Sequence, residues 1–193
     1  YVTVVLEDLY QSHNQSAVMR SADCYGVQDV HLIENRNSYD ISSTVSQGAR
    51  AWLSLHRHKE LEDNTQSTID ELRRAGYRII ATTPHTNDVL LDELDLEKGK
   101  MAFFFGTELT GLSSTVIDQA DEFVKVPVYG FTESLNVSVC AALIMYSVTQ
   151  RLRQSSLDWH LSGERKDEVF LQWYKHTVKV SAEILERFNG VEK

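Results

Sequence analysis

Three segments of the chain bring together side chains that could do chemistry. The first, NQSAVMR, runs from Asn14 to Arg20; the second, GTELTGLS, contains Glu108; the third, VPVYGFTESLN, contains Ser134 and Asn136. A guanidinium can anchor a phosphate and stabilise a developing oxyanion, but it is a poor proton acceptor. The carboxylate of Glu108 would repel phosphates unless a cation or donor meets it, so we expect it to pair with Arg20 or Asn14.

Each of these residues also has a purely structural interpretation. Asn14 lies at the start of a predicted helix and could act as its N-cap, and Ser134 is placed to cap a later one. Arg20 could pair with Asp23 on the helix surface, and Glu108 could cap a helix or a loop. Free backbone N–H groups at a helix start favour anionic groups, so a capping role for Ser134 is compatible with ligand binding.

An alternation of strands and helices sets the positions of these segments. Runs of β-branched and apolar residues predict strands, and glycines such as Gly26 and Gly76 mark helix ends. The predicted strands cover residues 2–9, 27–34, 51–58, 77–82, 101–105 and 122–128. The predicted helices cover residues 14–25, 65–75, a short stretch after 113, 134–153 and 167–188. The alternation predicts an α/β domain with a mostly parallel sheet that has helices on both faces.

The loops after the predicted strands are the expected place for a ligand, because ligands gather at the carboxyl ends of parallel strands. These loops begin at Tyr10, Thr82, Gly106 and Tyr129. The glycine-bounded loop GTELTG would by itself be weak evidence for nucleotide binding. It has neither the dinucleotide-binding nor the P-loop fingerprint, which disfavours both of those classes.

Taken together and in order, the three segments resemble the three motifs of the SpoU/TrmH family within the SPOUT superfamily. The resemblance covers residues 1–153, which would form the methyltransferase domain, and residues 154–193 would be a C-terminal helical extension. The family resemblance implies a C-terminal trefoil knot in the α/β fold. It also implies S-adenosylmethionine-dependent methylation of a ribose 2'-hydroxyl in RNA.

The resemblance assigns roles to individual residues. Arg20 matches the arginine of the first motif; we expect it to anchor the adjacent phosphate and stabilise the oxyanion, while a phosphate oxygen or water takes the proton. The other catalytic residues that the resemblance implies are Asn14, Glu108, Ser134 and Asn136. The cofactor-binding residues that it implies are Thr82, Gly106, Val126, Val128 and Leu135, with Thr83 as an alternative to Thr82.

The C-terminal extension, without a separate N-terminal RNA-binding domain, looks like the tRNA branch of the family, which methylates guanosine 18 in the D-loop. Ribosomal RNA or another tRNA position is the alternative target. Ribosomal RNA methyltransferases of the family usually add an N-terminal domain, and because the chain begins at Tyr1 and not at Met, the sequence leaves that alternative open. From other classes, a noncatalytic RNA-binding scaffold and a flavodoxin-like module remain open, although the latter leaves the three motifs unexplained.

A homodimer is expected from the resemblance, since family members bury the cofactor region at a dimer interface. The predicted C-terminal helix also needs a partner surface, which could be a second copy or its own domain. Its apolar positions at helical spacing are Phe170, Trp173, Thr177, Val180, Ile184 and Phe188.

Charge limits how this chain could bind RNA. The formal net charge of −9 over 193 residues argues against a generic polyanion binder. One segment, from Arg50 to Lys59, has three formal positive charges, two histidines and no acid. It could be part of an RNA path or a solvated basic strand edge, and the sequence favours neither.

The remaining composition predicts no metal, disulfide or membrane span. Cys24 and Cys140 are too few and too far apart for a disulfide framework, so we expect two core thiols. His56 and His58 share a strand face, but nothing nearby in the sequence completes a ligand set. The longest apolar candidate, from Val137 to Val148, is too short and too polar to cross a bilayer. With no signal-peptide pattern, a cytoplasmic protein is expected.

Overall fold

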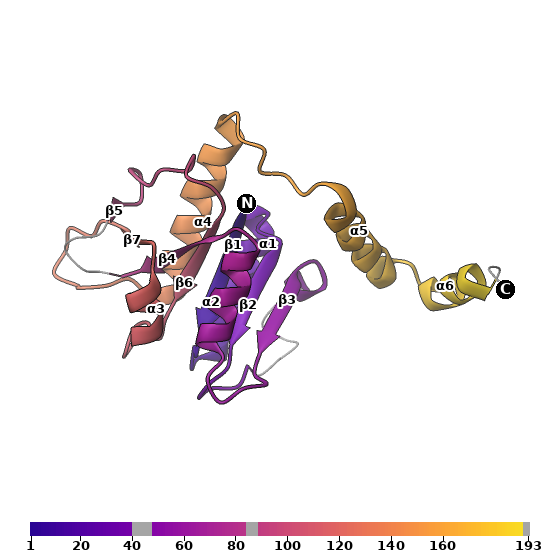
Figure 1. Ribbon diagram of the computed structural model, residues 1–193, viewed down its shortest axis with the longest axis horizontal. Coiled ribbons are helices and arrows are strands. Elements are labelled where there is room, and N and C mark those ends of the chain that lie inside the picture. The colour runs from indigo at the N-terminus through magenta and orange to yellow at the C-terminus, as the bar shows by residue number, and fades with distance from the viewer. Residues whose placement is uncertain (40–47, 84–88, 191–193) are drawn as a thin grey trace. The chain divides into compact units, whose positions relative to one another are not determined.

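Seven parallel strands form one sheet in the first part of the chain (Figure 1). This computed structural model describes residues 1–39, 48–83 and 89–190. The strand order is β3-β2-β1-β6-β4-β7-β5, and each neighbouring pair is parallel, which confirms the predicted α/β class. The strands are β1 (Val2–Glu7), β2 (Asp29–Ile33), β3 (Ser54–His58), β4 (Arg78–Thr82), β5 (Val89–Leu90), β6 (Met101–Phe105) and β7 (Glu122–Lys125).

Strands β1 and β6 lie side by side in the middle of the sheet. Their register runs from the pair Val2 and Met101 to the pair Leu6 and Phe105. All five residues of β6 are buried, because the strand is covered on both faces. A short run of uninterrupted apolar residues is the sequence signature of such a strand.

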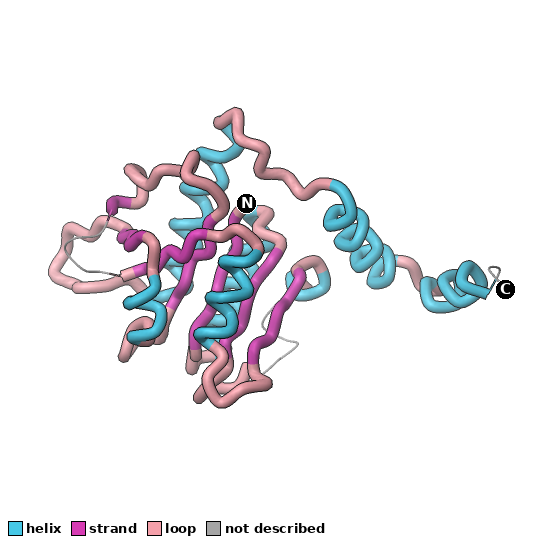
Figure 2. The backbone as a smooth tube through the Cα atoms, in the orientation of Figure 1, coloured by secondary structure: helices cyan, strands magenta, loops and turns pink. Residues whose placement is uncertain are grey.

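Helices cover the two faces of the sheet separately (Figure 2). Helices α1 and α4 pack on one face, and α2 and α3 pack on the other. The helices of this part are α1 (Ser12–Tyr25), the 3-10 turn η1 (Ala49–Ala51), α2 (Thr65–Arg74), α3 (Ser114–Gln119) and α4 (Val137–Gln154). The alternation of strands and helices thus yields the three layers that parallel sheets require.

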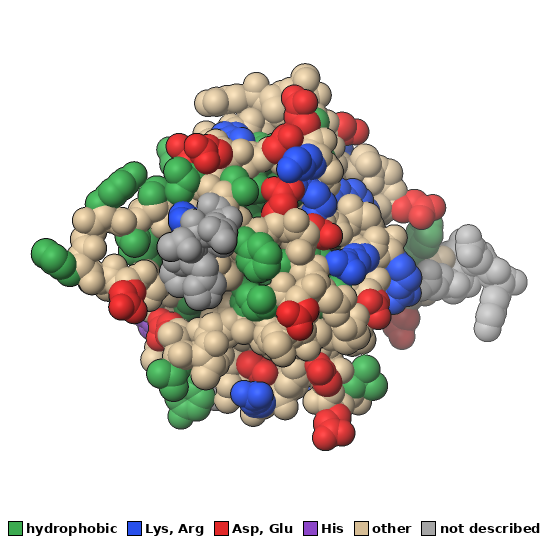
Figure 3. Space-filling model, turned by 60° about the vertical axis from the view of Figure 1, so that its left-hand side comes forward, with side chains coloured by type: hydrophobic (Ala, Val, Ile, Leu, Met, Phe, Trp, Pro, Cys, Tyr) green, Lys and Arg blue, Asp and Glu red, His purple; other side chains and the backbone are tan. Residues whose placement is uncertain are grey.

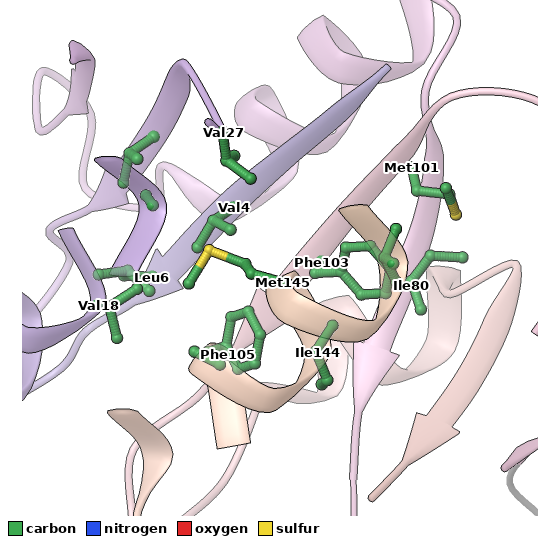
Figure 4. Packing of buried hydrophobic residues seen from close by; sticks show 14 of the residues in the cluster. Val4, Leu6, Val18, Val27, Ile80, Met101, Phe103, Phe105, Ile144 and Met145 are labelled. Atoms are coloured by element: carbon green, nitrogen blue, oxygen red, sulfur yellow. The ribbon is translucent and has the colours of Figure 1, made fainter. Parts of the chain in front are cut away.

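The larger core lies between the sheet and helices α1 and α4. Ile144 and Met145 of α4 approach Phe103 and Phe105 of β6 in Figure 4, while Val18 of α1 lies near β1. All five side chains are at most 1% exposed. Burial of one such side chain contributes roughly 1.5–3 kcal/mol to the free energy of unfolding. Together these contacts hold α4 against the sheet and so fix where the helix begins relative to the strand ends.

The chain divides into two compact units, Tyr1–Trp159 and His160–Lys193. The second unit contains two helices, α5 (Gly163–Thr177) and α6 (Ser181–Gly190), where the sequence pattern predicted a single helix over residues 167–188. The prediction of one continuous helix is therefore wrong. The break falls at Val178, whose backbone is extended, in a stretch with two β-branched valines that have low helix propensity.

Helix α4 is the longest helix of the first unit, and it is the one in which the apolar stretch from Val137 lies. It carries Arg151 and Arg153 in its last turn. Within residues 1–39, 48–83 and 89–190, no helix combines the length and the apolar character that crossing a bilayer requires.

The two cysteines lie in different environments. Cys140 on α4 is half-buried, but Cys24 on α1 is exposed, so the expectation of two core thiols is wrong for Cys24. The physical reason is helical spacing: Val18, Met19 and Ala22 of α1 face the sheet, and Cys24 does not share their face.

The basic segment from Arg50 to Lys59 contributes less positive charge than its sequence implies. The carboxylate of Glu34 accepts two hydrogen bonds from Arg57, at 2.6 and 2.7 Å, and so neutralises that guanidinium. Elsewhere on the surface, the face shown in Figure 3 has acidic side chains spread among the basic ones. The interpretation of β3 as a solvated edge of the sheet is therefore at least as consistent with the structure as its interpretation as part of an RNA-binding path.

Three histidines cluster on the face of the sheet that α2 covers. His31 Nδ1 lies 2.9 Å from His58 Nε2, and the ring of His31 stacks on that of His56 with a centroid distance of 4.5 Å. His56 Nε2 contacts Asp29 at 2.9 Å, and His58 Nδ1 lies 3.9 Å from Glu71 of α2. The spacing of residues along the sequence revealed only His56 and His58, which share β3. His31 joins them because β2 pairs with β3. Among the described residues, no group of three or more His, Cys, Asp or Glu side chains is arranged to hold a metal ion.

This cluster predicts acid sensitivity of the fold. Burial, and then the neighbouring His56 and His58, lower the pKa of His31 from 6.5 to about 3, against the opposing effect of Asp29. At a pH between these two pKa values, the unfolded chain binds more protons than the folded one. The free energy of unfolding therefore falls as the pH drops below 6.5. We expect the free energy of unfolding to decrease by about 2 kcal/mol between pH 7 and pH 5 from this residue.

Urea unfolding at pH 7, 6 and 5 measures this dependence. His31→Phe keeps a planar ring without a titrating group, so its pH dependence should be clearly shallower than that of the wild type. His13→Gln, at an exposed histidine, is the control and should keep the wild-type slope. An unchanged slope in His31→Phe would contradict the assignment.

Candidate functional site

Three polar side chains from the three segments meet at the carboxyl edge of the sheet. Asn14 Nδ2 donates to Glu108 Oε1 at 2.9 Å, and Asn136 Nδ2 donates to the same oxygen at 2.6 Å. Asn136 Nδ2 also lies 3.2 Å from Asn14 Oδ1. We call these three residues the amide–carboxylate junction. Of the two partners expected for Glu108, the structure has Asn14, and the sequence did not anticipate Asn136 as a second donor.

Asn14 reaches the junction from inside the first turn of α1. The helix begins at Ser12 with Gln11 as its N-cap, so the alternative interpretation of Asn14 as the N-cap is wrong. Asn14 is 3% exposed, and its Nδ2 also donates a hydrogen bond to Gln11 Oε1 at 3.2 Å. A buried amide needs its hydrogen bonds satisfied, and Glu108 and Gln11 supply the acceptors.

Asn136 is the N-cap of α4, where the sequence pattern predicted Ser134. Its Oδ1 accepts hydrogen bonds from the backbone N–H of Ser138 at 2.9 Å and from the Ser138 hydroxyl at 2.6 Å. The helix starts only at Val137, because Val137 is the first residue buried against the core. The cap fixes the orientation of the amide, so that its NH2 group faces Glu108.

Glu108 is held by a tight turn at the end of β6. Backbone hydrogen bonds of 3.1 and 3.0 Å join Thr107 and Gly111 in both directions, and the hydroxyls of Thr107 and Thr110 lie 2.7 Å apart. A Cβ on Gly106 would lie 2.2 Å from the carbonyl carbon of Gly111. Glycine at position 106 is therefore required by the close approach of two backbone segments.

A cavity of about 550 Å³ adjoins the junction. Glu108 and Ser134 line it, as does Thr83, which the sequence left as an alternative to Thr82. The five residues predicted for cofactor binding all lie on its wall: Thr82, Gly106, Val126, Val128 and Leu135. The volume is in the range of small-ligand sites, and the lining mixes apolar side chains with a few polar groups.

The cavity wall also includes residues that sequence reasoning missed. Lys125, Glu133 and Cys140 line it; Glu133 lies within the third segment, but none of the three was predicted as a site residue. Burial raises the pKa of the Cys140 thiol to about 11, so at neutral pH the side chain is a neutral, weakly polar part of the wall. Only the folding of the loop before α4 onto the ends of β4 and β6 brings these residues together.

Arg20 forms no hydrogen bond with the three residues of the junction. It is exposed, and in the described part of the chain it makes no hydrogen bond or ion pair, including with Asp23. Six positions after Asn14 on a helix correspond to a rotation of about 240°, so the two side chains leave α1 in different directions. The alternative pairing of Arg20 with Glu108 is therefore absent, and the guanidinium is available to an external anion.

Comparison with known proteins shows the family of this chain. Residues 1–146 match the SpoU rRNA Methylase family. A protein of Borreliella burgdorferi named tRNA (guanosine(18)-2'-O)-methyltransferase is 44% identical over 179 residues, which are 93% of this chain and 80% of that protein.

Solved structures share the fold. The A. aeolicus TrmH/SpoU tRNA modifying enzyme aligns with a TM-score of 0.77 and 25% identity, over 92% of this chain and 90% of that one. The SpoU methyltransferase AviRb from Streptomyces viridochromogenes, solved with the cofactor AdoMet, aligns with a TM-score of 0.69 and 22% identity, over 80% and 62% of the two chains. With three motifs in order, a matching sheet and a match over residues 1–146, this chain belongs to the SpoU rRNA Methylase family.

Proposed function

We propose that the protein transfers a methyl group from S-adenosylmethionine to the 2'-hydroxyl of guanosine 18 in tRNA. The observation that carries the proposal is the amide–carboxylate junction, in which residues from three separate motifs meet beside one cavity. The 44% identical relative, named for this reaction, supports the same target. Ribosomal RNA or another tRNA position is the alternative substrate.

The cavity is suited to S-adenosylmethionine. Val126, Val128 and Leu135 offer apolar contact, and the missing side chain of Gly106 lets the backbone of Gly111 close the turn that forms part of the wall. When bound, the cofactor supplies an electrophilic methyl group on a sulfonium. Glu133 on the wall could complement a positive charge, while Cys140, neutral at physiological pH, would not compete as a nucleophile.

The protein's own contribution to catalysis is positioning and charge. A ribose hydroxyl is weakly acidic, so it must be held in line with the methyl donor while alkoxide character develops. Arg20 would hold the neighbouring phosphate and stabilise the oxyanion, and a phosphate oxygen or water would accept the proton. The junction with Ser134 would line the ribose side of the cavity, with Glu108 held in place by two amide donors.

A homodimer is part of the proposal. On α4, Val139, Leu143 and Tyr146 are 41–52% exposed and recur at helical spacing, as on a helix that packs against a partner. In such a dimer, the exposed Arg20 of each copy could come closer to the cavity of the same copy or of its partner. Residues 1–153 would form the methyltransferase domain with its trefoil knot, and residues 154–193 the helical extension, in a cytoplasmic protein.

Methyl incorporation into unmodified total tRNA, followed by nucleoside mapping, tests the proposed function. We expect labelled 2'-O-methylguanosine at position 18. A folded protein that neither binds S-adenosylmethionine nor labels any RNA would contradict the proposal and favour a noncatalytic scaffold.

Arg20→Lys tests the catalytic role of the guanidinium. Lysine keeps the charge but cannot form the bidentate contact, so we expect RNA binding within a few-fold of wild type and turnover lower by about 100-fold. Single-turnover methylation and filter binding measure the two quantities. Arg74→Lys, at an exposed arginine on α2, should behave as wild type in both, whereas full turnover in Arg20→Lys would exclude the assigned role.

Gly106→Ala tests the cofactor site. The added Cβ would overlap the backbone of Gly111, which must shift the turn that lines the cavity, so we expect affinity for S-adenosylmethionine to fall at least about 10-fold. Calorimetric titration measures this, with circular dichroism to establish folding. Gly130→Ala is the matched control, because a Cβ there meets nothing within 4 Å. Equal affinity in both variants would place the cofactor elsewhere.

A further inference from the structure

Glu7, the last residue of β1, is a buried carboxylate outside the cavity lining. It is 3% exposed and has no cation among its described partners. Its Oε1 accepts hydrogen bonds from the Thr65 hydroxyl at 2.8 Å and the Ser113 hydroxyl at 2.7 Å, and its Oε2 accepts the Ser113 backbone N–H at 2.8 Å. A buried carboxylate without hydrogen-bond partners is costly, so these three donors are needed to stabilise Glu7 in the folded protein.

Ser113 connects this carboxylate to the loop that carries Glu108. It is the residue that follows the GTELTGL stretch, and it is also the N-cap of α3, where its hydroxyl oxygen accepts the N–H of Val116. The loop enters from β6, which is paired to β1, and it leaves at Ser113, which is bound to Glu7. Both ends of the loop are therefore attached to the same strand.

The second arm of Glu7 reaches a different part of the sheet edge. Thr65, the first residue of α2, donates to Glu7 and accepts from the side chain of Asn35 at 2.9 Å. The backbone N–H of Asn35 in turn donates to the carboxylate of Asp8 at 2.8 Å. Asp8, the residue after β1, has a left-handed backbone with φ of 52°. The consecutive carboxylates of Glu7 and Asp8 therefore bind different loops.

We propose that Glu7 is a positioning residue for the methyl-transfer site. By fixing Ser113, it holds the exit of the loop so that Glu108 meets the amides of Asn14 and Asn136. This inference rests on the proposed function for the meaning of the site. A carboxylate suits the task, because it accepts from both groups of Ser113 and Thr65 at once, whereas an amide would turn an NH2 group towards donors.

Glu7→Gln tests the proposal without a large change in shape. The hydroxyl oxygens of Ser113 and Thr65 already accept from Val116 and Asn35, so they are poorly placed to accept from the new NH2 group as well. We expect kcat for tRNA methylation to fall by about 10- to 100-fold, while KM for tRNA stays within about 3-fold. Backbone amides of residues 106–113 should exchange with deuterium faster than in the wild type.

Matched variants separate positioning from a general loss of stability. Thr65→Val removes the other donor to Glu7 but leaves Ser113 bound, so it should destabilise the fold while keeping kcat within about 3-fold of wild type. Ser113→Ala should reproduce the effect of Glu7→Gln, and Ser113→Thr, which retains a hydroxyl, should restore most of kcat. All assays are run where each variant is fully folded by circular dichroism.

The outcomes also distinguish this inference from the proposed function. If Glu108→Gln abolishes methylation while Glu7→Gln leaves kcat and the exchange of residues 106–113 unchanged, the positioning role is wrong and the methyl-transfer site stands. An equal loss of kcat in Thr65→Val and Glu7→Gln would likewise overturn the role. If the wild type does not methylate RNA, the proposed function fails, and the exchange experiment alone still decides whether Glu7 orders the loop.

Discussion

The parallel pairing of β1 with β6 is the constraint on which the rest of the structure depends. It places Leu6 beside Phe105, so that the loops following both strands leave the sheet at the same point of its carboxyl edge. The first of these loops leads into α1 and Asn14; the second contains Glu108. Strand pairing and the apolar core beneath it therefore bring together two segments about ninety residues apart, and hydrogen bonds such as those from Ser113 to Glu7 then hold the second loop in place.

The core then determines where the third segment arrives. Helix α4 packs through Ile144 and Met145 against the two central strands, which fixes the position of its first turn. Asn136 caps that turn, and the capping geometry directs its NH2 group to Glu108. Apolar packing sets the distance, and capping sets the direction. The junction is thus a consequence of how the sheet and helices fold, and not of a local sequence motif.

Much of this organisation could be predicted from the sequence. Alternating strand and helix patterns gave the parallel α/β class, and the family inferred from three ordered segments is confirmed by the match over residues 1–146. What could not be predicted depends on tertiary contacts. Asn136 and not Ser134 caps α4, because burial of Val137 decides where the helix starts. The partnership of His31 with His58 needs strand register, which spacing along the chain does not reveal.

The distribution of charge follows from the same arrangement. Glu7 and Glu108 are both satisfied by neutral donors, hydroxyls and amides, so the site retains its carboxylates without placing a cation beside them. Arg20 is therefore not neutralised within the described chain, and its full charge is available to a phosphate. In a protein with a net charge of −9, attraction to RNA cannot come from the overall field and must be local. Pairing carboxylates with neutral groups is the physical means by which an acidic protein can keep a guanidinium for its substrate.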